Sequence, residues 1–260
     1  MDICLLVNGQ SIPWWQADAI DYLLENTDAN ITTIVYNEYE QSRTIWETLK
    51  RGMELREWAV ISIMNNILLS PQPQREPVDI GDLINLNTVT ELNVEPNIVE
   101  GWKQSIPTQT VDRISEDSDV AIRFGFGFLV GPILSELQYG VLSYHHGDLR
   151  EYRGQPMGFW EFIHGENKVG ITVQQLSNKL DAGKIVTIKS IPINDLYTWE
   201  AIKHRLLIES EDMLADAIQS IQNNEVVEPD KIGKLYTLPS GVSTLKFAIK
   251  NLKGHLIKNS

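Results

Sequence analysis

The sequence predicts an α/β fold with a mostly parallel sheet flanked by helices. The first observation is a strand–helix–strand order at the start of the chain, over residues 2–7, 13–25 and 31–36. Parallel strands need a crossover connection, so this order implies a parallel pair with a helix on one face. The second observation is a further set of short β-branched runs, which ends in a long amphipathic helix over residues 199–223.

The N-terminal elements follow from apolar spacing. Residues 2–7 form an apolar run typical of a buried strand, and a turn-like Asn-Gly-Gln-Ser follows at residues 8–11. Pro13 suits the start of a helix. No G-x-G-x-x-G follows the first strand, which argues against a dinucleotide site there.

The middle of the chain predicts a second helix and weaker strands. Amphipathic spacing over residues 41–70 predicts a helix, which Pro71 and Pro73 end. Between residues 71 and 107 the pattern is polar and mixed, with short strand candidates at residues 83–86 and 89–94.

The second half predicts four strands and two helices. Residues 120–128 form a strand-like run rich in glycine and aromatics, and Gly131-Pro132 opens a short helix. The remaining strands are expected at residues 141–144, 169–176 and 185–193, before the helix over residues 199–223. We expect residues 1–225 to form an α/β domain and residues 226–260 a C-terminal extension, whose basic tail carries lysines but no acid after Asp230.

Charge and composition narrow the function classes. The chain has 260 residues and a net charge of −13. This charge disfavours a nucleic-acid partner, because binding to its phosphates depends on Lys and Arg. No apolar run approaches the length of a membrane span, and the N-terminus lacks the basic region of a signal peptide. We therefore expect no membrane partner and a cytoplasmic location. The one cysteine, Cys4, lies in an apolar run and is expected to be buried and inert.

Two adjacent histidines end one predicted strand. His145, His146 and Asp148 could shuttle protons, could ligate a metal, or could be structural. Adjacent side chains on a strand diverge, and no third distant histidine supports a metal motif, so no metal site is predicted. Asp181, in Leu-Asp-Ala-Gly, is by itself typical of a turn.

Glycines and aromatics near these residues allow two interpretations. Gly125 and Gly127 interrupt a strand-like run, which suits either a planar ligand lying on the backbone or tight sheet packing. Tyr152, Phe159 and Trp160 could stack on a sugar or nucleobase, although aromatics at this spacing are more often core residues.

An ordered set of motifs resembles the folate-dependent formyltransferases, which act on glycinamide ribonucleotide, methionyl-tRNA or amino sugars. It comprises Gly-Phe-Gly-x-Leu with Gly131-Pro132 after it, His-x-x-x-Leu-x-x-Tyr-Arg-Gly at residues 145–154, and then Pro156. Gly-x-Thr-Val at residues 170–173 and Leu-Asp-Ala-Gly at residues 180–183 complete it. The resemblance covers about residues 118–190 and implies a Rossmann-like formyltransferase fold that uses 10-formyltetrahydrofolate.

The resemblance also implies roles for individual residues. In the family an Asn, a His and an Asp act on formyl transfer to an amine; the His falls on His145 and the Asp on Asp181. The pterin-facing backbone falls on Gly127, Phe128 and Leu129. The loop closing over the pterin falls on Leu176, Ser177, Asn178, Lys179 and Leu180.

The chain departs from the family pattern at the position of the Asn, which is Ser143 here. A hydroxyl donates one hydrogen bond and reaches less far than a carboxamide. His146 and Arg150 are candidates to supply another donor, and Asp148 could bind an amine acceptor or be solvated.

The sequence therefore predicts formyl transfer from 10-formyltetrahydrofolate to an amine of a small molecule, with an amino-sugar nucleotide as one option. The alternatives are hydrolysis of the formyl-folate, and a folate-binding or partner-binding module whose chemistry has decayed. The family's tRNA-binding members carry a separate C-terminal barrel, whereas about 65 residues follow the last predicted strand here. A homodimer is compatible with this interpretation.

Overall fold

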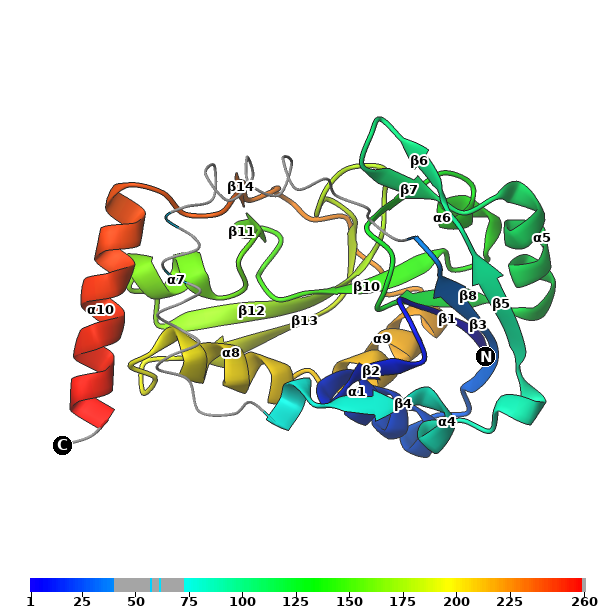
Figure 1. Cartoon of the computed structure of the whole chain (residues 1–260), viewed down its shortest axis with the longest axis horizontal. Helices are drawn as coiled ribbons and strands as arrows, with labels where there is room; N and C mark the ends of the chain where they lie inside the picture. Colours follow the sequence, from blue (N-terminus) through cyan, green and yellow to red (C-terminus); the bar gives the residue numbers. More distant parts are fainter. Residues whose placement is uncertain (40–56, 58–60, 62–72, 259–260) are drawn as a thin grey trace.

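The computed structural model describes residues 1–39, 57, 61 and 73–258 and is built on a seven-stranded sheet (Figure 1). In spatial order its strands are β13 (Lys184–Pro192), β12 (Lys168–Gln175), β10 (Val141–His145), β8 (Val120–Arg123), β1 (Asp2–Val7), β3 (Asn30–Asn37) and β5 (Thr90–Val94). Strands β10, β8, β1, β3 and β5 pair in parallel, whereas β12 is antiparallel to both of its neighbours. The prediction of a mostly parallel sheet is confirmed.

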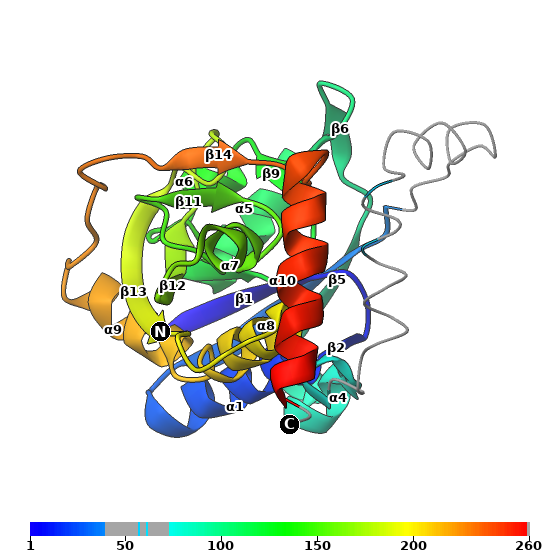
Figure 2. The same ribbon diagram turned by 90° about the vertical axis from the view of Figure 1, so that its left-hand side faces the viewer.

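Both faces of the sheet are buried, because side chains alternate along each strand. In β1, Ile3 and Leu5 belong to one apolar cluster, whereas Cys4 and Leu6 belong to another. Helices α1 (Trp14–Asn26), α8 (Trp199–Ile208) and α9 (Met213–Gln222) cover the first face, and α5 (Thr108–Asp117) and α6 (Ile133–Glu136) cover the second (Figures 1 and 2). Burial raises the pKa of the Cys4 thiol, as expected of an inert cysteine.

Short strands that the sequence did not predict add three small sheets. They are β2 (Ser11–Pro13) with β4 (Pro77–Asp79), β6 (Asn97–Val99) with β7 (Lys103–Ser105) and β9 (Phe128–Val130), and β11 (Tyr152–Gly154) with β14 (Lys234–Tyr236). Helices α4 (Ile80–Leu83) and α7 (Phe159–His164) and 3-10 turns at Pro73–Arg75 and Leu86–Thr88 complete the described elements.

The C-terminal segment packs against the rest of the chain at two places. Strand β14 pairs in parallel with β11. In α10 (Val242–Lys258), which stands at the left-hand end of the molecule in Figure 1 and faces the viewer in Figure 2, Phe247 is fully buried against the rings of Phe159 and Trp199. Asn251 also accepts a hydrogen bond from the backbone N–H of Trp199.

Some expected elements differ from the structure. The helix expected at residues 41–70 lies outside the described residues, except for residues 57 and 61. The strand expected at residues 83–86 is wrong: Asp79 caps helix α4 there by accepting a hydrogen bond from the backbone N–H of Gly81. The strand expected at residues 120–128 ends at Arg123, because Phe124 and Gly125 both donate their N–H groups to the carbonyl of Leu6.

The single helix expected at residues 199–223 is also wrong, because the chain breaks between α8 and α9 at residues 209–212. The hydroxyl of Ser210 bonds back to the carbonyl of Leu206, and the Ser210 carbonyl accepts the hydroxyl proton of Tyr144. Side-chain bonds of this kind compete with the helical ladder. Among the described helices, none is long and apolar enough to cross a membrane.

Candidate active site

Strand β10 carries Ser143 and His145 on one face and Tyr144 on the other, and His146, which directly follows the strand, lies on the side of Tyr144. The imidazole of His145 is 8% exposed, and its Nε2 lies 2.9 Å from the carbonyl oxygen of Tyr152. A carbonyl oxygen only accepts hydrogen bonds, so Nε2 carries the proton in the neutral ring. The lone pair is then on Nδ1, which lies 3.8 Å from the Oδ1 atom of Asp181. His145 can therefore take up a proton at Nδ1 beside a carboxylate.

Asp181 reaches His145 from the connection between β12 and β13. Its backbone has a φ of 43°, which is typical of the turn that the Leu-Asp-Ala-Gly sequence predicts. Its second carboxylate oxygen accepts a hydrogen bond from the backbone N–H of Gly154 at 2.9 Å. Arg153 also donates to the carbonyl of Leu180. These contacts fix the carboxylate, which lies near His145 although 36 positions separate the two residues in the sequence.

Ser143 is 2% exposed and pairs across the sheet with Arg123, the last residue of β8. The Nε and Nη2 atoms of Arg123 donate to the Ser143 hydroxyl at 3.2 and 2.9 Å. Nη1 donates to the carbonyl of Gly127 at 2.7 Å. Burial lowers the pKa of the Arg123 guanidinium, and the negative charge of Asp181 opposes that shift. A cation that the sequence patterns did not predict therefore lies beside Ser143.

Sequence reasoning missed Arg123, although a signal was present. The preceding residues Val120, Ala121 and Ile122 are all fully buried in the sheet. An arginine that ends such a run, two residues before a glycine, is energetically costly at that position unless its charge has partners.

His146 lies on the opposite face of β10 from His145. Its ring packs 5.2 Å from that of Trp15 and 5.9 Å from that of Tyr144, and its Nε2 is 3.1 Å from the hydroxyl of Ser210. Burial, followed by the charges of His145 and Arg75, lowers the pKa of His146 to about 3. The structure does not bring this residue to the His145 side, and its contacts are those of a neutral core residue.

Asp148 and Arg150 bind each other. The guanidinium of Arg150 donates to both carboxylate oxygens of Asp148, at 2.9 and 2.7 Å. Burial alone raises the pKa of Asp148, but the hydrogen bonds and charge of Arg150 outweigh it and hold the pKa below its ordinary range. The pair lines a small cavity of about 90 Å³ together with Tyr152 and Glu161.

The two segments expected to hold a folate border the same apolar cluster. Leu176 packs against the apolar cluster that contains Phe126 and Leu129. The loop after Leu176 is folded by Ser177, whose hydroxyl bonds to the carbonyl of Ala182 at 3.2 Å, and a cavity of about 280 Å³ lies against it. That cavity is lined by Leu176, Ser177, Asn178 and Lys179 but by none of Gly127, Phe128 and Leu129. Phe128 instead contacts the ring of Trp102.

The two glycines that interrupt this region differ in their surroundings. A Cβ on Gly125 would lie 2.4 Å from the backbone of Val7 and Asn8, so tight packing requires glycine there. A Cβ on Gly127 would meet only the side chain of Gln104, at 3.5 Å, which is ordinary contact. Close packing therefore accounts for Gly125 alone.

The aromatic residues near the site divide between core and surface. Phe159 is fully buried. Tyr152 and Trp160 are half-buried and contact the ring of Tyr236, with centroids 5.3 and 4.8 Å apart. Tyr236 belongs to β14, so the C-terminal segment completes an aromatic cluster beside the strand that bonds Asp181.

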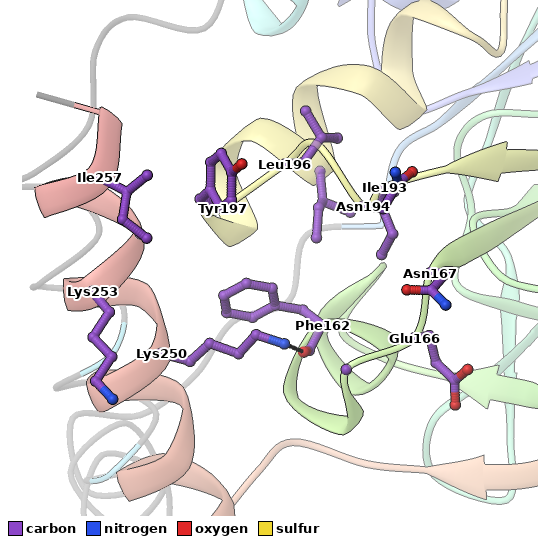
Figure 3. A pocket seen from close by; sticks show the side chains of 13 residues that line it. Phe162, Glu166, Asn167, Ile193, Asn194, Leu196, Tyr197, Lys250, Lys253 and Ile257 are labelled. Atoms are coloured by element: carbon purple, nitrogen blue, oxygen red, sulfur yellow. Dashed lines mark hydrogen bonds between the residues drawn. The ribbon is translucent and has the colours of Figure 1, made fainter. Parts of the chain in front are cut away.

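A third cavity, of about 280 Å³, lies between α10 and the α7 and α8 side of the molecule (Figure 3). Lys250 and Phe162 line it, and the ammonium of Lys250 donates to the carbonyl of Phe162. None of the site residues predicted from the sequence lines this cavity. Within the described part of the chain, no three His, Cys, Asp or Glu side chains gather as a metal site would require.

Comparison with known proteins shows which family this chain resembles. Residues 109–218 match the family model described as formyl transferase. The methionyl-tRNA formyltransferase of Fusobacterium nucleatum is 25% identical over 186 residues, which cover 70% of this chain and 57% of that protein. The corresponding enzyme of Thermotoga neapolitana is 28% identical over 43% of this chain and 36% of its own length. The chain thus spans 57% of the length of the first relative and 36% of the length of the second.

Solved structures agree on the fold. Glycinamide ribonucleotide transformylase 1 of Symbiobacterium toebii superposes with a TM-score of 0.53 at 17% identity, covering 91% of this chain and 94% of that one. An N-formyltransferase of Helicobacter canadensis, solved with folinic acid and dTDP-3-aminofucose, gives 0.54 at 12% identity over 96% and 79% of the two chains. The described fold is the Rossmann-like formyltransferase fold.

Proposed function

We propose that this chain, whose residues 109–218 match the formyl transferase family model, transfers a formyl group from 10-formyltetrahydrofolate to an amine of a small molecule. One observation carries the proposal: His145, Asp181 and Ser143 converge from β10 and the β12–β13 connection, within the matched residues.

The proposed reaction uses the proton-accepting nitrogen of His145. The amine nitrogen attacks the formyl carbon, and the carbonyl oxygen becomes an oxyanion. His145 takes the proton lost by the amine at Nδ1, where Asp181 at 3.8 Å stabilises the imidazolium. The Nε2–H bond to Tyr152 holds the ring in the orientation this transfer needs.

The donor site is proposed to lie between Gly127–Leu129 and the loop of residues 176–180. The apolar cluster that joins Leu176 to Leu129 supports one wall for a planar ring, and the fold-related Helicobacter canadensis enzyme was solved with folinic acid. The site lies beside His145, because Arg123 links Gly127 to Ser143.

For the acceptor we propose a small molecule, with an amino-sugar nucleotide as the first to test. The Helicobacter canadensis enzyme was solved with dTDP-3-aminofucose. A nucleic-acid acceptor is disfavoured by the net charge of −13, since phosphate contacts depend on Lys and Arg. A cytoplasmic location and a homodimer remain part of the proposal.

The test is turnover of 10-formyltetrahydrofolate by the purified chain, alone and with pools of amino-sugar nucleotides and other amines. Tetrahydrofolate release is followed by absorbance, and formylated products are identified by mass spectrometry. Product that appears only with an amine, and not with a His145→Ala variant, supports the proposal. A matched His146→Phe variant controls for the loss of a histidine from the same strand.

Other outcomes select the alternatives. Tetrahydrofolate release without an amine indicates a hydrolase that uses water as the acceptor. Binding of folinic acid without any turnover indicates a folate-binding module. If the protein neither binds folinic acid nor turns over the formyl-folate, the proposed function is wrong.

A further inference from the structure

Arg123 places a fixed cation between two parts of the candidate site. It ends β8 directly beside Ser143 of β10, and the two residues are register partners in the sheet. Alternation along the two strands directs Arg123, Ser143 and His145 to the same face. The guanidinium therefore lies on the side of the sheet where His145 meets Asp181, and not in the core on the opposite face.

The guanidinium is held by a fork of hydrogen bonds. Nη1 donates to the carbonyls of Phe126 and Gly127, at 3.3 and 2.7 Å, while Nε and Nη2 donate to the Ser143 hydroxyl. Nη2 has a second hydrogen for which the hydrogen bonds of the described residues show no acceptor. A rigid cation with one donor still available is suited to bind negative charge that develops beside it.

Ser143 has a donor available as well. Its oxygen accepts hydrogen bonds from Arg123, so it is used chiefly as an acceptor. Its own hydroxyl proton has two carbonyl contacts, to Arg123 and Tyr144, both at 3.5 Å. A bond of that length is weak, so the proton can turn toward a better acceptor. The two residues together offer one guanidinium N–H and one O–H.

We propose that Arg123 and Ser143 act as one oxyanion-stabilising unit for formyl transfer. The inference rests on the proposed function and adds a charged catalytic residue to it. When the amine nitrogen bonds to the formyl carbon, the carbonyl electron pair moves to oxygen, which takes hydrogen bonds from this unit. The carbon–oxygen double bond then re-forms, the bond to N10 breaks, and N10 gains the proton that the amine lost to His145.

The chemistry explains why a serine is sufficient at residue 143. A hydroxyl alone is a short neutral donor, whereas a hydrogen bond from a cation to an oxyanion is about twice as strong as a neutral one. In the order of steps above, the charge appears on oxygen only in the transition state and the intermediate. Arg123 therefore lowers the barrier and contributes little to binding of the ground state.

The experiment compares Arg123→Met, Arg123→Lys, Ser143→Ala and the double variant Arg123→Met/Ser143→Ala with the unmodified chain. Two quantities are measured: kcat for formyl transfer, and the Kd for folinic acid, which probes the donor site without turnover. We expect Arg123→Met to lower kcat by about 10²- to 10³-fold with a Kd within a few-fold of the original. The exposed Arg113→Met on α5 is the matched control and is expected to change neither.

The unit makes a further prediction about the double variant. Because Arg123 orients the Ser143 hydroxyl, its removal also disables the Ser143 donor, so the double variant is expected to lose no more than Arg123→Met alone, whereas independent roles would multiply. Arg123→Lys keeps the charge but not the fork, and we expect an intermediate kcat. If Arg123→Met does not fold, as judged by circular dichroism, then Ser143→Ala and Arg123→Lys decide, and an unchanged kcat in both overturns the inference.

Two results separate this inference from the proposed function. Normal kcat in a folded Arg123→Met protein, or a loss of rate matched by an equal loss of folinic acid binding, overturns the role of Arg123 and leaves formyl transfer standing. Absence of both turnover and folinic acid binding in the unmodified chain removes both.

Discussion

The two faces of β10 differ sharply at its last residues. On one face His145 contacts a carboxylate and a backbone carbonyl, and Arg123 binds the neighbouring Ser143. On the other face His146 lies among the rings of Trp15 and Tyr144. The two histidines have the same chemistry and adjacent positions, but one has charged partners and the other aromatic ones.

The difference shows that environment, and not residue type, gives an imidazole its role. Burial among aromatic rings removes the stabilisation of the charged form, so the pKa of His146 falls to about 3 and the ring stays neutral. His145 has a carboxylate 3.8 Å from Nδ1, which compensates a proton there. One residue step along the chain therefore separates the histidine proposed for proton transfer from a histidine that packs in the core.

The largest predicted effect is the loss of activity when the face of β10 that carries His145 is changed. Under the proposed function, we expect His145→Ala and Asp181→Ala each to lower kcat by about 10³-fold, the middle of the range for a general acid or base. Asp181→Asn can still accept the N–H of Gly154 and so separates charge from positioning. The measurement is steady-state formyl transfer, with thermal unfolding as a check on the fold.

Comparable activity in a folded Asp181→Asn protein would show that the charge is not needed, and the carboxylate would then be a positioning group. His146→Phe provides the comparison from the other face and is expected to keep most of the activity, because its ring does not contact Asp181 or Tyr152.

Much of the fold could be predicted because it depends on local patterns. The strands β1, β3, β10, β12 and β13 coincide with β-branched runs, and the strand–helix–strand order requires a parallel pair. The break between α8 and α9 could not be predicted from helical periodicity alone, because one of the hydrogen bonds at the break comes from Tyr144, which is 66 residues away from Ser210. Tertiary contacts of this kind override helical periodicity.

The candidate site, like the fold, could be predicted from the sequence only in part. Alternation along one strand separates His145 from His146, and that separation was expected from the sequence. The pairing of Asp148 with Arg150 and the position of Arg123 beside Ser143 depend on side-chain geometry and on the register between β8 and β10. The register is set by the whole sheet, so no local motif gives it.

A second, smaller effect concerns the pH dependence of stability and tests the side of β10 on which His146 lies. The unfolded chain binds a proton on His146 below its ordinary pKa of 6.5, whereas the folded chain does so only near pH 3. The folded state is therefore destabilised as the pH falls through 6.5. Between pH 7.5 and pH 5 we expect a loss of about 2 kcal/mol from this group.

The measurement is urea unfolding of the unmodified chain and of His146→Phe at the two pH values. The contribution of His146 is the change in their difference, because every other titrating group is common to both proteins. Parallel pH profiles for the two proteins would mean that His146 binds its proton equally well in the folded and unfolded states, and the comparison between the faces would fail.

The smallest effect is predicted for Tyr144→Phe, also on the core face. The hydroxyl of Tyr144 donates to the carbonyl of Ser210 at 2.7 Å, while its ring packs 5.3 Å from that of Trp15. Phenylalanine keeps the ring and removes one hydrogen bond, which contributes about 1 kcal/mol net. The Ser210 carbonyl still accepts the N–H of Met213 at 3.3 Å, so no buried acceptor is orphaned. We expect a melting temperature lower by about 2–4 °C and an unchanged kcat. A fall in kcat would mean that the two faces of β10 are coupled, since Tyr144 reaches His145 only through the backbone of the strand.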